Sequence, residues 1–342
     1  MKLSIKKTLY SLVLAGSLLT LSCGKEEPKV SIEIENSIDD EEDTSVEIEP
    51  MVIETEIDKE MGNNEKMEVE PQPEEEIDKD SILYNTKVIH TVITDERVNI
   101  RRENSEESEV IGIYPEGREF ELISNQDPEW YQINYYGETG YVSKHYSHET
   151  IKRVISIPMI DKGCMVESDT IYEEKDLTTE KDTLAKREFV EIYQRYENCY
   201  LVATIDTIGF ISKDKVKLLP GDVFVVDISN QEARIYEDDE MTLLAPVITG
   251  KKDTYLASEQ GLFKVWYKYP KPRDIVPGAH VDFGVFYNRD DGFHDAGWQK
   301  PEWFGGDNYI KHGSHGCCNM RWKDAEYGNS VMDKGEYVLV KE

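Results

Sequence analysis

An internal repeat constrains the middle of this chain more than any other sequence feature. Residues 117–144 align without a gap to residues 186–213, at an offset of 69 positions, and eight of the 28 aligned positions are identical. The apolar positions largely correspond, for example Phe120 with Phe189. Period-two alternation between turns rich in Asn, Asp and Gly predicts short strands in both copies. Two similar small β units therefore follow one another.

The first copy lies in a segment that resembles bacterial SH3-like domains. The segment begins "VNIRRENSEESEVIGIY" and ends "EWYQINYYGETGYVSKHY". The resemblance implies a small β-barrel over residues 88–148. A second unit, over residues 158–219, shares only the later half of the pattern, and Cys199 stands where Trp130 does. Such domains look like binders of cell walls or peptides, but packing modules that hold a neighbouring domain fit equally well.

Two cysteines of the second unit, Cys164 and Cys199, raise the question of a disulfide. In an oxidising compartment a bridge would stabilise a small barrel by about 2–4 kcal/mol. We expect the pair to be bridged, with two buried thiols as the alternative, because spacing alone does not show that two Cβ atoms meet.

The first residues have the pattern of an export signal. Lys2, Lys6 and Lys7 precede an apolar run over residues 8–22, which is short for a membrane-spanning helix and typical of a signal peptide. The run ends in "LTLSC", which resembles the lipobox of bacterial lipoproteins. The resemblance implies a signal peptide over residues 1–22 and lipidation of Cys23. An ordinary signal peptide is the alternative.

A strongly acidic segment follows Cys23. Residues 24–80 contain 23 acidic residues, five lysines and no aromatic residue. Such a composition cannot bury enough apolar surface to offset chain entropy, which predicts a disordered tether over residues 23–80. The rest of the chain is also acidic, and this argues against nucleic-acid binding. A lipidated tether would anchor an exported protein to a membrane that faces the cell wall. By analogy with bacterial lipoproteins, Gly24 in place of Asp after Cys23 favours sorting to the periplasmic face of an outer membrane.

Longer strands are predicted after residue 220. "DVFVVDIS", "EARIYE", "LLAPVITG" and "GLFKVWYKYP" are β-rich runs, and residues 322–332 form a helix candidate before a last strand, "EYVLV". A mostly antiparallel sandwich is expected for residues 220–342. The fold class is therefore mainly β: a sandwich with one or two helices after two small barrels and a tether.

Histidines and cysteines gather near the end of this region, in "KHGSHGCCNMR" over residues 311–321. A nucleophilic cysteine needs a base or a cationic partner, and no histidine follows Cys317. The order argues against papain-like peptidases, in which the cysteine comes first. His294, His312 and His315 are the candidates. Neighbouring side chains on a strand rarely meet head-on, so His294 is favoured over His315.

The segment "FHDAGW…FGGDNYIKHGSHGCCNM" resembles the signature of the L,D-transpeptidase catalytic domain. The resemblance covers residues 221–341 and implies Cys317 as nucleophile and His294 as base. It further implies pocket or substrate roles for the residues around them, with Gly316 as a backbone oxyanion donor: His315, Ser314, Asn319, Tyr309 and Asp295. Two departures are the separation of 23 residues between His294 and Cys317 and the lack of prolines in "TYLASEQGLF".

The resemblance implies a peptidoglycan enzyme that forms a thioester with a stem tetrapeptide, releases D-Ala and passes the acyl group to an amine. It needs no cofactor, its partners are stem peptides, and a monomer is expected. A carboxypeptidase, an enzyme that anchors proteins to the wall and a non-catalytic wall-binding lipoprotein remain as alternatives. A metal site on His312, His315, Cys317 and Cys318 is disfavoured, because the ligands are too closely spaced for a tetrahedral site.

Strand geometry predicts different roles for the adjacent thiols of Cys317 and Cys318. Side chains of neighbouring strand residues point to opposite faces, so Cys317 and Cys318 cannot both face one cleft. A disulfide between them would be strained, because neighbouring Cα atoms lie about 3.8 Å apart and bridged ones usually 4.4–6.8 Å. Cys318 is therefore predicted to be a small buried hydrophobe.

Overall fold

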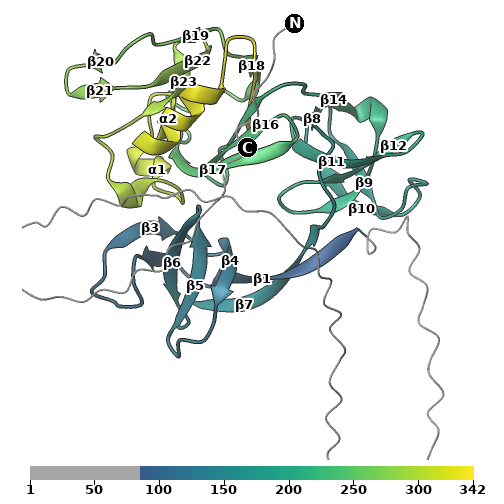
Figure 1. Ribbon diagram of the computed structural model, residues 1–342, viewed down its shortest axis with the longest axis horizontal. Coiled ribbons are helices and arrows are strands. Elements are labelled where there is room, and N and C mark those ends of the chain that lie inside the picture. Colours follow the sequence, from purple (N-terminus) through teal and green to yellow (C-terminus); the bar gives the residue numbers. More distant parts are fainter. Residues whose placement is uncertain (1–84) are drawn as a thin grey trace, which may run out of the picture. The chain divides into compact units, whose positions relative to one another are not determined.

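The computed structural model describes residues 85–342. The predicted signal peptide of residues 1–22, the lipidation site Cys23 and the acidic segment to residue 80 lie outside the described residues. Strands far outnumber helices in the described part, so the mainly β prediction is confirmed (Figure 1). Between residues 85 and 342, no helix is both long and apolar enough to cross a membrane.

The first unit is a seven-stranded sheet with the order β3-β2-β6-β5-β4-β1-β7. Alternating residues such as Val92, Ile100, Ile133 and Val142 point inward and are fully buried, as period-two patterning predicts. The strands are β1 (Thr86–Thr94), β2 (Val98–Arg101), β3 (Val110–Tyr114), β4 (Glu119–Ser124), β5 (Trp130–Tyr135), β6 (Glu138–Ser143) and β7 (Ser147–Ile155).

The second unit repeats this topology strand for strand, with the order β10-β9-β13-β12-β11-β8-β14. The aligned repeat corresponds to β4, β5 and β6 in the first unit and to β11, β12 and β13 in the second, so the sequence repeat is a structural one. The elements are β8 (Asp161–Met165), β9 (Asp169–Tyr172), β10 (Glu180–Leu184), β11 (Phe189–Arg195), β12 (Cys199–Ala203), β13 (Ile208–Ser212), the 3₁₀ turn η1 (Lys213–Lys215) and β14 (Val216–Leu218).

The predicted disulfide between Cys164 and Cys199 is wrong, because both thiols are free and buried. Cys164 lies on β8 and Cys199 on β12, and β11 runs between these two strands. Two strand spacings amount to about 9–10 Å. That exceeds the Cα separation that a disulfide can bridge. Each thiol instead packs in a hydrophobic cluster of its own.

The C-terminal domain is built on one mixed nine-stranded sheet with the order β18-β25-β15-β16-β17-β24-β23-β22-β19. The elements are β15 (Val223–Asp227), β16 (Glu232–Glu237), β17 (Glu240–Ile248), β18 (Gly261–Lys264), β19 (Tyr267–Lys268), β20 (Arg273–Val276), β21 (Ala279–Val281), β22 (Gly284–Asn288), β23 (Asp291–Asp295), η2 (Pro301–Trp303), α1 (Tyr309–His312), β24 (Cys318–Met320), α2 (Trp322–Val331) and β25 (Tyr337–Lys341).

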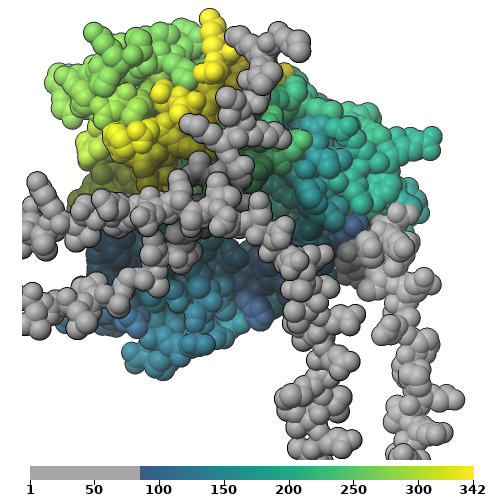
Figure 2. Space-filling view, in the orientation of Figure 1, coloured from purple at the N-terminus to yellow at the C-terminus, as the bar shows by residue number. Residues whose placement is uncertain are grey.

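The expected sandwich takes the form of this single sheet, which curls around its own core. Phe224, Phe293 and Val338 are fully buried in that core, and the Phe224 and Phe293 ring centroids lie 4.4 Å apart. Helix α2 forms where the sequence predicts a helix, and it packs on β23 and β22 (Figure 1). In the space-filling view the yellow C-terminal residues lie over the green strands of the same domain (Figure 2). The curl places β23 and β24 beside each other.

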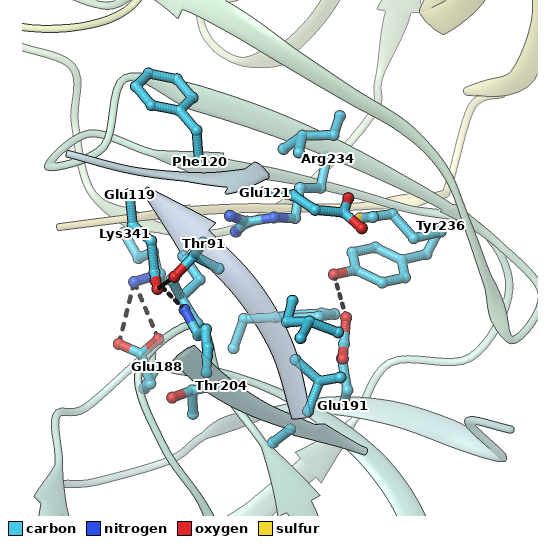
Figure 3. A pocket seen from close by; sticks show the side chains of 18 residues that line it. Thr91, Glu119, Phe120, Glu121, Glu188, Glu191, Thr204, Arg234, Tyr236 and Lys341 are labelled. Atoms are coloured by element: carbon cyan, nitrogen blue, oxygen red, sulfur yellow. Dashed lines mark hydrogen bonds and ion pairs between the residues drawn. The ribbon is translucent and has the colours of Figure 1, made fainter. Parts of the chain in front are cut away.

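The second unit and the C-terminal domain share a hydrophobic cluster. Cys164 and Phe189 of the second unit pack with Val223, Tyr236 and Leu339 of the C-terminal domain. A cavity of about 360 Å³ beside this cluster is lined by residues of both units and of the C-terminal domain. Figure 3 shows two of the contacts across it: Lys341 pairs with Glu188, and the Tyr236 hydroxyl donates to Glu191 at 2.8 Å. These contacts favour a packing role for the second unit.

A buried ion pair crosses the same boundary. The Lys341 ammonium lies 3.0 Å from Glu188 of the second unit and 3.1 Å from Asp227 of the C-terminal domain (Figure 3). Burial lowers the pKa of Lys341, but the two carboxylates outweigh it, so the pKa is raised. The ammonium therefore stays charged and links the two parts.

Replacing Lys341 by Met is expected to destabilise the protein by about 3 kcal/mol, because two carboxylates would lose their shared partner in a buried site. Denaturant unfolding of the full chain measures the change. Lys334→Met is the matched control, since Lys334 is exposed in the turn before β25. Equal stability of the two variants would contradict a linking role for Lys341.

Candidate active site

Two neighbouring parallel strands place His294 and Cys317 on the same side of the sheet. On β23 and β24, Phe293 pairs with Cys318 and His294 with Asn319. Phe293 and Cys318 point into the hydrophobic core. Because side chains alternate along a strand, His294, Asn319 and the preceding Cys317 share the opposite face. The strand register therefore supports His294 as the partner of Cys317, and the role of His294 as base stays a prediction.

The imidazole of His294 is buried, and its orientation is held by the backbone. Its Nδ1 lies 2.9 Å from the carbonyl oxygen of Asp295. A carbonyl can only accept, so Nδ1 carries the proton and Nε2 is left with a free lone pair. Burial lowers the pKa of His294 below its ordinary value, against the raising effect of Asp295. The neutral, basic form of the imidazole is therefore favoured.

The thiol of Cys317 is partly exposed, and its protonated form is favoured in the resting state. Its Sγ lies 3.7 Å from the carbonyl oxygen of Asp290, within range of a weak S–H donor. Burial raises the pKa of Cys317 to about 11, with smaller contributions from Asp291 and Asp290, while a hydrogen bond from the Gly292 backbone opposes the rise. The site thus pairs a neutral thiol with a neutral imidazole.

This pairing predicts the pH dependence of acylation. A neutral His294 can accept the thiol proton, so the rate should fall as the pH drops through the lowered histidine pKa, below the ordinary 6.5. The rate should then be level from pH 7 to 9, because the Cys317 pKa of about 11 lies above that window. Stopped-flow acylation by a carbapenem across pH 4–9 measures the profile. An acidic midpoint above 6.5 would contradict the assignment.

A tight turn presents Cys317. The Ser314 hydroxyl donates to the carbonyl of Cys317 at 2.5 Å and accepts the Gly316 N–H at 3.1 Å. Gly316 has φ +125°, and a Cβ there would lie 2.4 Å from an oxygen of Asp291, so only glycine fits. The N–H of Gly316 is thus engaged with Ser314, and its role as an oxyanion donor stays a prediction.

A second set of contacts, which the sequence interpretation missed, holds the turn from the other side. The hydroxyl of Ser258 donates to the Gly316 carbonyl at 2.7 Å and accepts the N–H of Gly250 at 2.9 Å. The Ser314 N–H donates to the Thr249 carbonyl at the end of β17. Ser258 lies in "TYLASEQGLF", the segment that departs from the expected proline pattern. Its hydroxyl ties that segment to the turn that carries Cys317.

The other two candidate histidines point elsewhere. The ring of His312 stacks on Trp303, with centroids 3.9 Å apart and an interplanar angle of 9°. His315 is exposed, and its side chain makes no hydrogen bond within residues 85–342. With Cys318 in the core, these side chains diverge, so the "HxxHxCC" pattern does not converge on one point. In the described part of the chain, no three His, Cys, Asp or Glu side chains are arranged around a common metal position.

The four residues with predicted substrate roles, Ser314, Asn319, Tyr309 and Asp295, are all buried. Tyr309 packs in a hydrophobic cluster with Ile248 and Phe304, and a contact of Tyr309 with substrate stays a prediction. The Asp295 carboxylate accepts two backbone N–H groups, from Asp282 and Phe283 at 2.9 and 2.8 Å, so this side chain has a structural role.

Asn319 differs from these two. Its side-chain oxygen is buried and has no hydrogen-bond partner among the described residues. It shares the face of His294 and Cys317, so it keeps its place in the candidate pocket.

Carboxylates near Cys317 were also missed by the sequence interpretation. Asp290 and Asp291 directly precede Gly292, whose N–H reaches the thiol. Burial raises the pKa of Asp291, Glu259 and Asp290 add to the rise, and Arg289 opposes it. Three carboxylates and one arginine therefore lie near the thiol side of the site, and their net negative charge favours a cationic group over an anionic one.

Cys318 is fully buried in the core, as the sequence analysis predicts. Burial raises the pKa of its thiol far above the ordinary value. Cys318→Val is therefore expected to leave acylation within about twofold of the wild type and to change stability by less than about 1.5 kcal/mol, since Val has a similar volume. Acylation kinetics and denaturant unfolding test this. A large loss of acylation with unchanged stability would mean that Cys318 takes part in the chemistry.

Comparison with known families agrees with this geometry. Residues 221–340 match the model of the L,D-transpeptidase catalytic domain, and residues 96–148 match that of the bacterial SH3 domain. A search of the curated proteins gave no match.

Solved structures are similar to the chain over its C-terminal part. The catalytic domain of the Enterococcus faecium L,D-transpeptidase is 28% identical over 36% of this chain and 98% of its own, with a TM-score of 0.31. L,D-transpeptidases from Mycobacterium smegmatis and Stackebrandtia nassauensis are 18% and 22% identical, with TM-scores of 0.31 and 0.30. The M. smegmatis match covers 44% of this chain and 70% of that protein. The S. nassauensis match covers 36% of this chain and 56% of that protein. By its two family-model matches, this chain contains a C-terminal L,D-transpeptidase catalytic domain preceded by a bacterial SH3 domain.

Proposed function

We propose that the protein is a peptidoglycan L,D-transpeptidase with Cys317 as nucleophile and His294 as base. The observation that carries the proposal is the placement of both side chains on one face of β23 and β24, with His294 Nδ1 bound to the Asp295 carbonyl. Nucleophilic catalysis needs a thiol beside an oriented base, and this arrangement supplies one.

In the first half-reaction the Cys317 sulfur attacks the carbonyl carbon that joins a diamino acid to a terminal D-Ala. The C–S bond forms while the thiol proton passes to His294 Nε2. The oxyanion needs fixed N–H donors, and the Cys317 N–H donates to no other described residue. The C–N bond then breaks, His294 returns the proton to the leaving amine, and D-Ala departs. A thioester on Cys317 remains.

In the second half-reaction an acceptor resolves the thioester. We infer that the acceptor is the amine of another stem peptide, because Asp290, Asp291 and Glu259 would attract an ammonium group to the thiol side of the site. The amine loses a proton to His294 and attacks the acyl carbon, which releases the Cys317 thiol. Water would give carboxypeptidation instead, and a protein lysine would give protein anchoring.

Intact-protein mass spectrometry after incubation with a carbapenem tests the proposed nucleophile. An E. faecium L,D-transpeptidase catalytic domain, 29% identical to this chain, has been solved acylated by ertapenem. One adduct per wild-type chain is expected. Its absence would leave a non-catalytic wall-binding protein as the better account. Muropeptide analysis of a strain without the protein then separates cross-linking from trimming.

We also propose that the protein is exported and anchored through a lipid on Cys23, at the periplasmic face of a membrane. The signal-like first 22 residues and the "LTLSC" motif support this location. Labelling cells with radioactive palmitate should mark the wild type and not a Cys23→Ala variant. Equal labelling of the two proteins would disprove lipidation at Cys23.

A further inference from the structure

A cleft of about 540 Å³ is lined by residues of the first unit and of the catalytic domain. We call it the junction cleft. Its apolar lining comes from Ile111 and Tyr135 of the first unit and from Ala296, Pro301 and Phe304 of the catalytic domain. The volume is within the range of sites that bind small ligands and peptide side chains.

Direct contacts hold the two walls of the junction cleft together. The Arg97 guanidinium reaches both oxygens of Asp307 at 2.5 Å, which joins the first unit to the segment between His294 and Cys317. On the same segment, a Cβ at Gly305 would lie 2.3 Å from the Tyr114 hydroxyl, so only glycine allows this close approach. The cleft is thus formed without a ligand, which lowers the entropy cost of binding.

Three cations line the junction cleft, in a chain with a net charge of −31: Arg102, Arg321 and Lys323. Glu138 binds Lys323 directly and lies 3.8 Å from Arg102, whose Nε donates to Glu109 at 2.7 Å. Arg102 and Lys323 are therefore already paired with carboxylates at the rim, and Arg321 is the lining cation that matters most for an anion.

Arg321 supplies hydrogen-bond donors that are not fully used. Its Nε donates to Asp324 at 2.5 Å, and its side chain is only 18% exposed. The two terminal nitrogens of the guanidinium make no hydrogen bond to any residue from 85 to 342. A pair of parallel N–H donors matches the two oxygens of a carboxylate. The half-exposed Trp322 indole beside them offers an apolar contact for the adjoining chain.

The junction cleft also lies close to the proposed base along the backbone. Ala296 is on its wall and is separated from His294 by one residue, so their Cα atoms are at most about 7 Å apart. An extended peptide advances about 3.3 Å per residue. A substrate with its scissile bond at Cys317 could therefore place a group a few residues away in the cleft.

We propose that the junction cleft binds a carboxylate of the stem peptide that is remote from the scissile bond. The inference rests on the proposed function for its choice of ligand. Arg321 would hold the carboxylate through the two terminal nitrogens of its guanidinium. The first SH3-like unit would thereby be part of the substrate site and not only a wall-binding module.

Direct binding tests this proposal. A stem tetrapeptide with a free carboxylate remote from the scissile bond, and the same peptide with that group amidated, are titrated calorimetrically into the full chain carrying Cys317→Ser to prevent turnover. The acid should bind about tenfold more tightly than the amide. Arg321→Gln should remove most of that difference, because it removes the two terminal nitrogens that would bind the carboxylate. Lys323→Gln, which removes a cation already paired with Glu138, should remove less of it.

Lys334→Gln is the matched control, since it removes an equally exposed lysine beyond the other end of α2 and should change neither affinity. Carbapenem acylation of the cleft variants on the wild-type Cys317 background should match the wild type, which shows that the chemical site is intact. Equal affinities for acid and amide would overturn the cleft proposal even with normal acylation. Loss of acylation in the wild type would instead overturn the proposed function.

Discussion

Replacing Cys317 by Ser should abolish covalent capture of a carbapenem and reduce D-Ala release by at least about a thousandfold. Serine keeps the size of the side chain but has a far less acidic and less nucleophilic group. The neutral His294 cannot compensate, because it accepts a proton and supplies no nucleophile. Intact mass after carbapenem treatment and D-Ala release from a stem tetrapeptide are the two measurements.

The control for this substitution is already in the chain. Cys318→Val removes a neighbouring thiol that faces the core, and it should retain the adduct. Peptide mapping of the wild-type adduct should place the added mass on Cys317. An adduct that persists in Cys317→Ser would move the nucleophile to another thiol, and the other described thiols are Cys164, Cys199 and Cys318.

Replacing His294 by Gln should lower the acylation rate by about a thousandfold, within the usual contribution of a general base. Gln has a similar volume and can still donate to the Asp295 carbonyl, so the buried site should keep its packing. It cannot accept the thiol proton near neutral pH. The residual rate should rise with pH as the thiolate of Cys317 forms on its own, toward its pKa of about 11.

His315→Ala provides the comparison for His294→Gln. His315 is the histidine nearest to Cys317 in sequence, yet it is exposed, and its loss should change the rate by less than about tenfold. Thermal unfolding of both variants separates a folding defect from a chemical one. Near-normal acylation in His294→Gln, with a large loss in His315→Ala, would reverse the assignment of the base.

Local pattern was sufficient for much of the architecture. The alignment of residues 117–144 with residues 186–213 anticipates two units of the same topology, because alternation and turn residues specify strands locally. The helix over residues 322–332 and the core position of Cys318 follow from the same kind of information. The pairing of Cys317 with His294 came from a motif, and the parallel register of β23 and β24 explains it.

Contacts between residues far apart in the chain could not be predicted from the sequence. Spacing suggested that Cys164 and Cys199 could meet, and only the strand order places β11 between them. The motif predicts Gly316 as an oxyanion donor, and only the folded turn shows its N–H engaged with Ser314. Ser258 carries no local signal, because its role depends on a carbonyl 58 positions away.

By itself, the sequence determined which segments form strands and which thiol and imidazole are suited to acyl transfer, since alternation, turn chemistry and a short motif are properties of neighbouring residues. Tertiary structure alone decided which hydrogen-bond donors stay free, which thiols remain apart and how Lys341 links two domains. It also formed the junction cleft, whose Arg102 and Arg321 lie more than two hundred residues apart. Such arrangements depend on chain packing, in which each group's partners are set by the whole fold.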